Sequence, residues 1–101
     1  MTKPPTEHEA NLALAQTLIV AECDSIKELL LEKNRKYGNS ALQNVGVFAK
    51  VPPGVQIRVR IDDKLKRIQN GNEALEDEDT VLDLIGYLVL LRVEKRYNEG
   101  R

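Results

Sequence analysis

The sequence predicts an all-α fold, a compact bundle of three to four helices that is completed by oligomerisation. Apolar side chains recur at steps of three and four over long stretches of the 101 residues, which is the spacing of one helix face. The segments between these stretches contain the Gly, Asn and Pro residues that end helices. One Phe and no Trp are present, so the core must consist of Leu, Ile and Val.

The first predicted helix runs from about residue 7 to residue 36. Thr6 is expected to cap its start, and an acidic first turn suits the positive end of the helix dipole. Asp24 interrupts the pattern, which leaves open a division into two shorter helices. Gly38 is the expected stop signal. The apolar positions on one face of this helix are Leu12, Ala15, Ile19, Cys23, Ile26 and Leu30.

A loop and a second helix follow. Residues 38–53 contain Gly, Asn, Ser and Pro and are predicted to be a loop; ordered loops of this length are usually functional. The stretch after it fits a strand over residues 55–61 and a helix over residues 57–68. The helix spacing covers the whole stretch, Pro53 suits a helix start, and the letters "NGN" suit a helix end. A helix is therefore predicted.

The last predicted helix begins in "EDTVLDLIGYLVLL", residues 78–91, and extends to about Arg96. Its apolar side chains lie on nearly all sides, so we expect it to be central and buried. Residues 1–6 are a loose polar lead and residues 97–101 a polar tail. The whole chain, residues 1–101, is expected to be one domain, because its length is too small for two ordinary ones.

Composition narrows the classes of function. Fifteen basic and 16 acidic residues give a net charge of −1, which argues against a nucleic acid as the partner. The apolar run of the last helix is shorter than the about 20 residues that span a bilayer, and no apolar leader is visible, so no membrane partner is expected. The single Cys23 cannot form a disulfide within the chain, which fits the cytoplasm.

The acid inside the apolar last helix, Asp83, has two interpretations. In the first, Thr80 caps the helix and Asp83 completes a capping box three residues later. In the second, Asp79 and Asp83 share one helix face, as do Glu28 and Glu32 on the first helix. Four such carboxylates would repel one another unless Mg²⁺ or Mn²⁺ lay between them. Acidic pairs on an ordinary solvated face are the alternative for the first helix.

Basic and polar side chains provide a possible phosphate site. The letters "EKNRKYGNS" place four of them after Glu32, and the middle helix carries more on one face. Lysine and arginine neutralise phosphate charge, whereas amide and aromatic side chains contact a base or sugar. A solvated, salt-bridged face is the alternative. The predicted substrate-binding residues are Lys33, Asn34, Lys36, Tyr37, Arg60 and Lys64.

Three blocks, "LLEKNRKYGNSAL", "RIDDKLKRI" and "EDTVLDLIGYLVLL", follow one another in this order. Over residues 26–93 the chain thereby resembles small phage and prophage proteins of the nucleotide-modification-associated domain type. That group is in turn similar, more distantly, to the all-α nucleotide pyrophosphohydrolases of the MazG type. The resemblance implies a bacterial host cytoplasm if the chain is phage-encoded.

This resemblance implies an enzyme that splits a nucleoside triphosphate into a monophosphate and pyrophosphate with Mg²⁺. It implies Glu28, Glu32, Asp79 and Asp83 as metal ligands, with Glu32 and Asp83 as catalytic residues. The chain departs from the MazG pattern, because it has E-x-x-x-E and D-x-x-x-D where that type has E-x-x-E and E-x-x-D. Two alternatives therefore remain: a non-catalytic oligomer that sequesters a nucleotide or nucleotide signal, and a structural or protein-interaction helical module.

Overall fold

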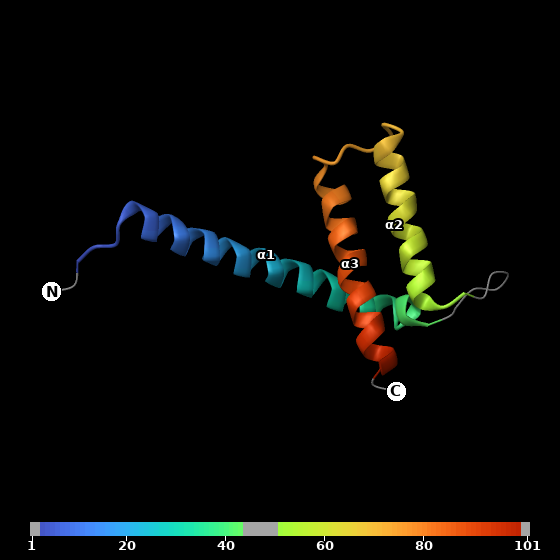
Figure 1. The fold of residues 1–101 in the computed structure, drawn as a ribbon. Coiled ribbons are helices and arrows are strands. Elements are labelled where there is room, and N and C mark those ends of the chain that lie inside the picture. The colour runs from blue at the N-terminus through green and yellow to red at the C-terminus, as the bar shows by residue number, and fades with distance from the viewer. Residues whose placement is uncertain (1–2, 44–50, 100–101) are drawn as a thin grey trace. The chain divides into compact units, whose positions relative to one another are not determined.

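Three α-helices and one short 3₁₀ helix form the secondary structure of the described residues (Figure 1). The computed structural model describes residues 3–43 and 51–99. The elements in chain order are α1 (Glu7–Tyr37), η1 (Ser40–Leu42), α2 (Pro53–Gln69) and α3 (Glu78–Glu99). No strand occurs in these two ranges, so the predicted all-α class is confirmed.

The chain divides into two compact units, Met1–Glu32 and Lys33–Arg101. The first unit contains most of α1. The second contains the last residues of α1 together with η1, α2 and α3. Among the described residues, no helix combines the length and the hydropathy that a membrane span requires.

Local capping signals define α1. The Thr6 side-chain oxygen accepts a hydrogen bond from the Glu9 amide at 3.1 Å, and the Thr6 carbonyl accepts one from the Ala10 amide at 2.8 Å. The predicted Thr6 cap is therefore confirmed. The helix continues through Asp24 without a break. It ends before Gly38, whose φ of 64° is the left-handed conformation that glycine adopts most easily.

Both ends of α2 also follow their local sequence. Pro53 occupies the first helical turn, where a missing amide hydrogen costs no helical hydrogen bond. After the last turn, Gly71 adopts a φ of 78° and its amide donates to the Ile68 carbonyl at 3.1 Å. The Asn72 amide donates to the Arg67 carbonyl at 2.9 Å. This pair of hydrogen bonds is a Schellman motif, which reverses the chain direction.

Helices α2 and α3 run antiparallel and pack against each other, and η1 packs against both (Figure 1). The small core of this unit contains Ile57, which is 2% exposed, and Leu42. Gly54 is buried where α2 approaches α3: a Cβ atom there would lie 3.0 Å from a carboxylate oxygen of Glu94. The helix hairpin therefore has a close contact near the start of α2.

The exposure of α3 differs from the prediction. Its one buried residue with a described side chain is Thr80, and its apolar side chains are half-buried or exposed. The expectation of a helix buried on all sides is wrong for this unit, because α2 and the short η1 cover only part of its surface. The helix also continues to Glu99, so three residues of the predicted polar tail are helical.

Candidate functional site

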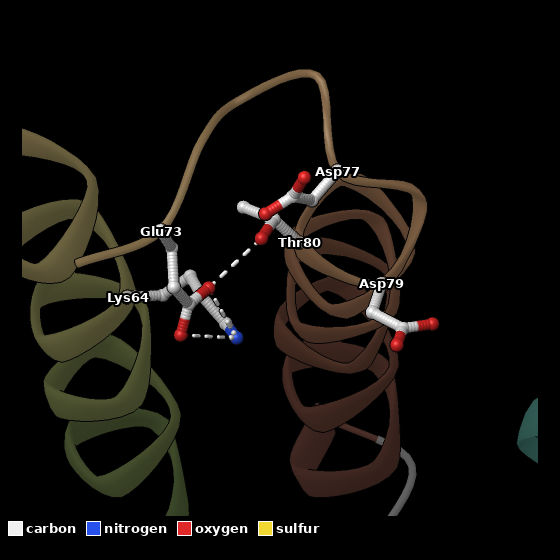
Figure 2. A pocket seen from close by; sticks show the side chains of 5 residues that line it. All are labelled: Lys64, Glu73, Asp77, Asp79 and Thr80. Atoms are coloured by element: carbon white, nitrogen blue, oxygen red, sulfur yellow. Dashed lines mark hydrogen bonds and ion pairs between the residues drawn. The ribbon is translucent and has the colours of Figure 1, made fainter. Parts of the chain in front are cut away.

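A group of charged side chains joins the C-terminal part of α2 to the first turns of α3. Its centre is Lys64, whose Nζ lies 2.9 Å from Asp83 Oδ2 and 2.9 Å from Glu73 Oε2. Figure 2 shows Lys64 and Glu73 pointing toward each other between the two helices. The Lys64 side chain is 12% exposed, so its charge is largely shielded from water and needs these two partners.

Glu73 connects this lysine to two further residues. The Thr80 hydroxyl donates a hydrogen bond to Glu73 Oε2 at 2.8 Å, and Thr80 is only 2% exposed. A guanidinium nitrogen of Arg67 lies 3.5 Å from Glu73 Oε1. Two bases, two acids and one hydroxyl thus form the Lys64 cluster, which consists of Lys64, Arg67, Glu73, Thr80 and Asp83.

Hydrogen bonds within the cluster hold Lys64 and Glu73 in their charged forms. The hydrogen bond to Asp83, followed by that to Glu73, raises the pKa of the Lys64 ammonium above its ordinary value, although partial burial acts in the opposite direction. The hydrogen bond from Lys64, followed by that from Thr80, lowers the pKa of the Glu73 carboxyl. Lys64 is therefore a cation, and Glu73 an anion, throughout the physiological pH range.

The turn after α2 positions Glu73. Because Gly71 reverses the chain, the acid two residues later returns toward the basic last turns of α2. A second turn follows, in which the Ala74 amide donates to the Asp77 carboxylate at 3.3 Å. The Asp77 carbonyl then accepts from the Val81 amide at 3.2 Å, which is a first helical hydrogen bond of α3.

A polar hollow of about 510 Å³ opens beside the Lys64 cluster. Three acids, one base and one hydroxyl line it, so its lining has an excess of two negative charges. An anionic ligand therefore needs an additional cation before it can bind here. The lining residues are Lys64, Glu73, Asp77, Asp79 and Thr80, all drawn in Figure 2.

The structure revises the interpretation of Asp83. Helix α3 begins at Glu78, so Thr80 lies inside the first turn and is not the residue before the helix. Its hydroxyl donates to Glu73, and Asp83 pairs with Lys64. The capping box is therefore wrong, because the helix starts three residues earlier than that interpretation requires. Asp79 lines the hollow, but its carboxylate is turned away from Lys64 (Figure 2).

The two predicted acids of α1, Glu28 and Glu32, belong to the first unit. Glu28 is exposed and lies 3.9 Å from the Lys27 ammonium, whereas Asp79 and Asp83 belong to the second unit. Within the described parts of either unit, no three His, Cys, Asp or Glu side chains are grouped as a ready-made metal site. The four-carboxylate site stays a prediction.

Part of the predicted basic block at the end of α1 has a structural role. The Asn34 amide donates to the Gly38 carbonyl at 3.1 Å and to the Asn39 side chain at 3.0 Å, which stabilises the end of the helix. The Lys36 ammonium lies 5.4 Å from the centre of the exposed Tyr37 ring, a cation–π distance. Lys33 is exposed on the same helix.

On α2, Arg60 lies one turn before Lys64 and is exposed. Of the six predicted substrate-binding residues, Lys64 is the one that the structure places beside the polar hollow. Glu73 was not predicted. The sequence feature that could have indicated Glu73 is its position directly after "NGN", the predicted helix end. A chain that reverses at a helix end brings the acid that follows back toward the basic last turn of that helix.

Comparisons with known proteins give no match to a family model, a curated protein or a solved structure. The resemblance to the nucleotide-modification-associated and MazG types therefore stays a prediction from three sequence blocks. Two of these blocks meet at the candidate site, because Lys64 belongs to "RIDDKLKRI" and Asp83 to "EDTVLDLIGYLVLL".

Proposed function

We propose that the chain binds a nucleoside triphosphate together with its Mg²⁺ ion at the polar hollow, and that it splits this nucleotide into a monophosphate and pyrophosphate. One observation carries the proposal: the Lys64 ammonium lies 2.9 Å from both Asp83 and Glu73, at the edge of a hollow with an acidic excess. A lysine can contact phosphate oxygens and carboxylates can bind Mg²⁺, so the two kinds of group suit the two parts of a magnesium-bound phosphate chain.

Lys64 is the residue that we assign to phosphate recognition. An ammonium group has three donors, and three carboxylate oxygens lie within reach of it here: Glu73 Oε1 at 3.2 Å, Glu73 Oε2 at 2.9 Å and Asp83 Oδ2 at 2.9 Å. A phosphate oxygen would replace one of these acceptors, and the longest contact, to Glu73 Oε1, is the one that we assign to this exchange. Its raised pKa keeps it charged. Arg60 and Arg67 lie about one turn away on either side along α2 and extend the positive charge in both directions.

The acids suit a magnesium ion that arrives with the nucleotide. Mg²⁺ in phosphate-transfer sites is commonly held by one or two carboxylates together with phosphate oxygens and water. Asp83 and Asp79 lie in the first two turns of α3 and offer oxygen ligands of this type. When bound, the ion would neutralise phosphate charge and favour a nucleophilic water.

The chain's own contribution is electrostatic. Lys64 faces the negative charge that grows on the phosphate oxygens as the bond breaks, and Glu73 and Thr80 fix the position of that ammonium. Asp83 touches the same ammonium and lies where it can orient a water molecule. We place the reaction in the cytoplasm, where nucleotides and Mg²⁺ are present and the exposed Cys23 stays reduced.

Incubation of the protein with each common ribo- and deoxyribonucleoside triphosphate and Mg²⁺, followed by ion-exchange analysis of the products, tests the proposal. Asp83→Asn is expected to lower kcat/KM about 100-fold, because it removes a charge from the site. Asp62→Asn is the matched control, since Asp62 is an exposed acid on α2. Its activity is expected to stay within about twofold of the unmodified protein.

Calorimetry with the same nucleotides, in Mg²⁺ and in EDTA, separates binding from turnover. Binding that needs Mg²⁺ and is lost in Lys64→Met supports the site, provided that circular dichroism shows the variant folded. Binding without any product overturns the hydrolysis and leaves a nucleotide-sequestering protein. Absence of both binding and product for every nucleotide overturns the proposal, as does equal affinity in Lys64→Met.

A further inference from the structure

Helix α1 exposes its apolar side chains along most of its length. None of its residues is buried, and a helix of 31 residues is about 46 Å long. Helices gain most of their stability from packing of an apolar face, and large exposed apolar surfaces mark interaction sites. The large apolar residues of α1 that are at least 38% exposed, apart from the terminal Tyr37, are Leu12, Leu14, Leu18, Ile19, Val20, Leu29 and Leu31.

One stripe of this helix has a mirror-like order. The α1 seam consists of Leu12, Ala15, Ile19, Cys23, Ile26 and Leu30, which share one face at steps of three and four. Leu12 and Leu30 are each nine residues from Ala21, and Ile19 and Cys23 are each two residues from it. An antiparallel copy centred on Ala21 therefore places Leu12 beside the partner's Leu30 and Ile19 beside the partner's Cys23, whereas Ala15 and Ile26 fall beside the partner's Lys27 and Gln16.

The charges at the two ends of α1 are complementary to those of an antiparallel copy. The first turn carries Glu7 and Glu9, and the last turn carries Arg35 and Lys36. Antiparallel pairing puts the acidic turn of one copy beside the basic turn of the other and also opposes the two helix dipoles. A parallel pair would bring like charges together at both ends. The net charge of −1 adds little repulsion between whole chains.

We infer that α1 is a self-association helix, and that two copies of this chain pair through it in antiparallel orientation along the α1 seam. The occupant of this apolar surface is a second copy, because the end charges of the helix are complementary to those of its own reverse and four of the six seam residues meet one another in this register. The inference does not depend on the nucleotide site. A protein that fails to bind nucleotide can still pair, and an active one can prove to be a monomer.

Disulfide trapping between two different single-cysteine variants tests the orientation. One variant carries Leu12→Cys with Cys23→Ala, and the other carries Leu30→Cys with Cys23→Ala. Oxidation of their mixture is expected to give a covalent species of twice the 11.4 kDa chain mass. Each variant alone should give little of this covalent species. In an antiparallel pair, residue 12 of one copy lies about 27 Å from residue 12 of the other copy, and the same holds for residue 30.

Cross-linking of either variant alone contradicts the antiparallel arrangement, and absence of cross-linking in the mixture contradicts the pairing.

Light scattering of the unmodified chain gives an independent measure. The expected mass is twice 11.4 kDa or another even multiple of it. Ile19→Lys should shift this mass toward the single chain. Thr17→Lys is the matched control, since Thr17 is exposed on the side of α1 away from the seam. A single-chain mass for the unmodified protein at all concentrations overturns the inference.

Discussion

Helix α1 and the α2–α3 hairpin differ in how far their apolar side chains are buried. In the hairpin and the η1 helix packed against it, apolar positions converge on Ile57 and Leu42, which are buried within the chain. In α1, equally apolar positions such as Leu18 and Ile19 are about 60% exposed. The difference shows that helical periodicity specifies which side chains share a face, whereas the partner that covers this face depends on contacts between elements or between copies.

The largest predicted effect falls on the hairpin. Ile57→Ala should destabilise it by about 2–3 kcal/mol, because the side chain is 2% exposed and its removal leaves a cavity in a very small core. Urea unfolding measures this loss. Val59→Ala on the same helix is the control, since Val59 is 50% exposed and should change stability by no more than about 0.5 kcal/mol. Equal losses in both variants would show that the hairpin core is not centred on Ile57.

An intermediate effect is expected from pH, and it belongs to the hairpin alone. The pKa of Glu73 is lowered from an ordinary value of 4.5, so its contribution to stability is complete above pH 4.5 and is lost as pH falls below it. The pKa of Lys64 is raised from 10.5, so its contribution is complete below pH 10.5 and is lost as pH rises above it. Between pH 4.5 and pH 10.5 the Lys64–Glu73 pair should therefore make a constant contribution to the free energy of unfolding.

Urea midpoints measured from neutral pH down to below pH 4.5, for the unmodified protein and for Glu73→Gln, isolate the contribution of Glu73. The variant should lose less stability than the unmodified protein below pH 4.5, because it has no carboxylate to protonate at this position. Identical acid slopes would contradict the ion pair. Arg67 pairs with Glu73 in a more exposed position, so salt should weaken that contact more than the one with Lys64.

The smallest predicted effect is at the close contact between α2 and α3. Gly54→Ala places a Cβ about 3 Å from the Glu94 carboxylate, which is the end of a flexible side chain and can move. The helical preference of Ala offsets the cost of this movement, so the change in stability should stay within about 0.5 kcal/mol. Urea unfolding checks it, and Glu94→Ala in the same background should remove the crowding. A loss well above 1 kcal/mol would indicate that the backbones cannot separate.

The sequence predicted the ends of α1 and α2 well because short-range chemistry determines them. The residues that determine these ends act within one turn of their own positions, so a few neighbouring residues of the sequence are enough to predict them. They are Thr6, Gly38, Pro53 and Gly71. The partner of Asp83 was not predicted. Lys64 reaches it only because two turns bring α2 and α3 together, and this depends on the packing of two helices.

Sequence reasoning selected both Lys64 and Asp83 but assigned them to different parts of a site, one to phosphate and one to metal. It missed Glu73, because that residue lies in an acidic connection whose carboxylates look alike in the sequence. Thr80 was selected for the wrong reason: its hydroxyl supports Glu73 and does not cap the helix. Side-chain partners of this kind depend on a reversal of the chain, which residue spacing does not describe.

The chain reversal at Gly71 also bears on the order of events during folding. The ion pairs of the Lys64 cluster join residues at most 19 positions apart, from residue 64 to residue 83. Contacts between near neighbours in sequence form quickly, since little chain entropy is lost in closing a short loop. The charged cluster can therefore assemble as soon as the hairpin closes, on a single chain and at any concentration, whereas the proposed pairing of α1 would have to wait for two chains to meet.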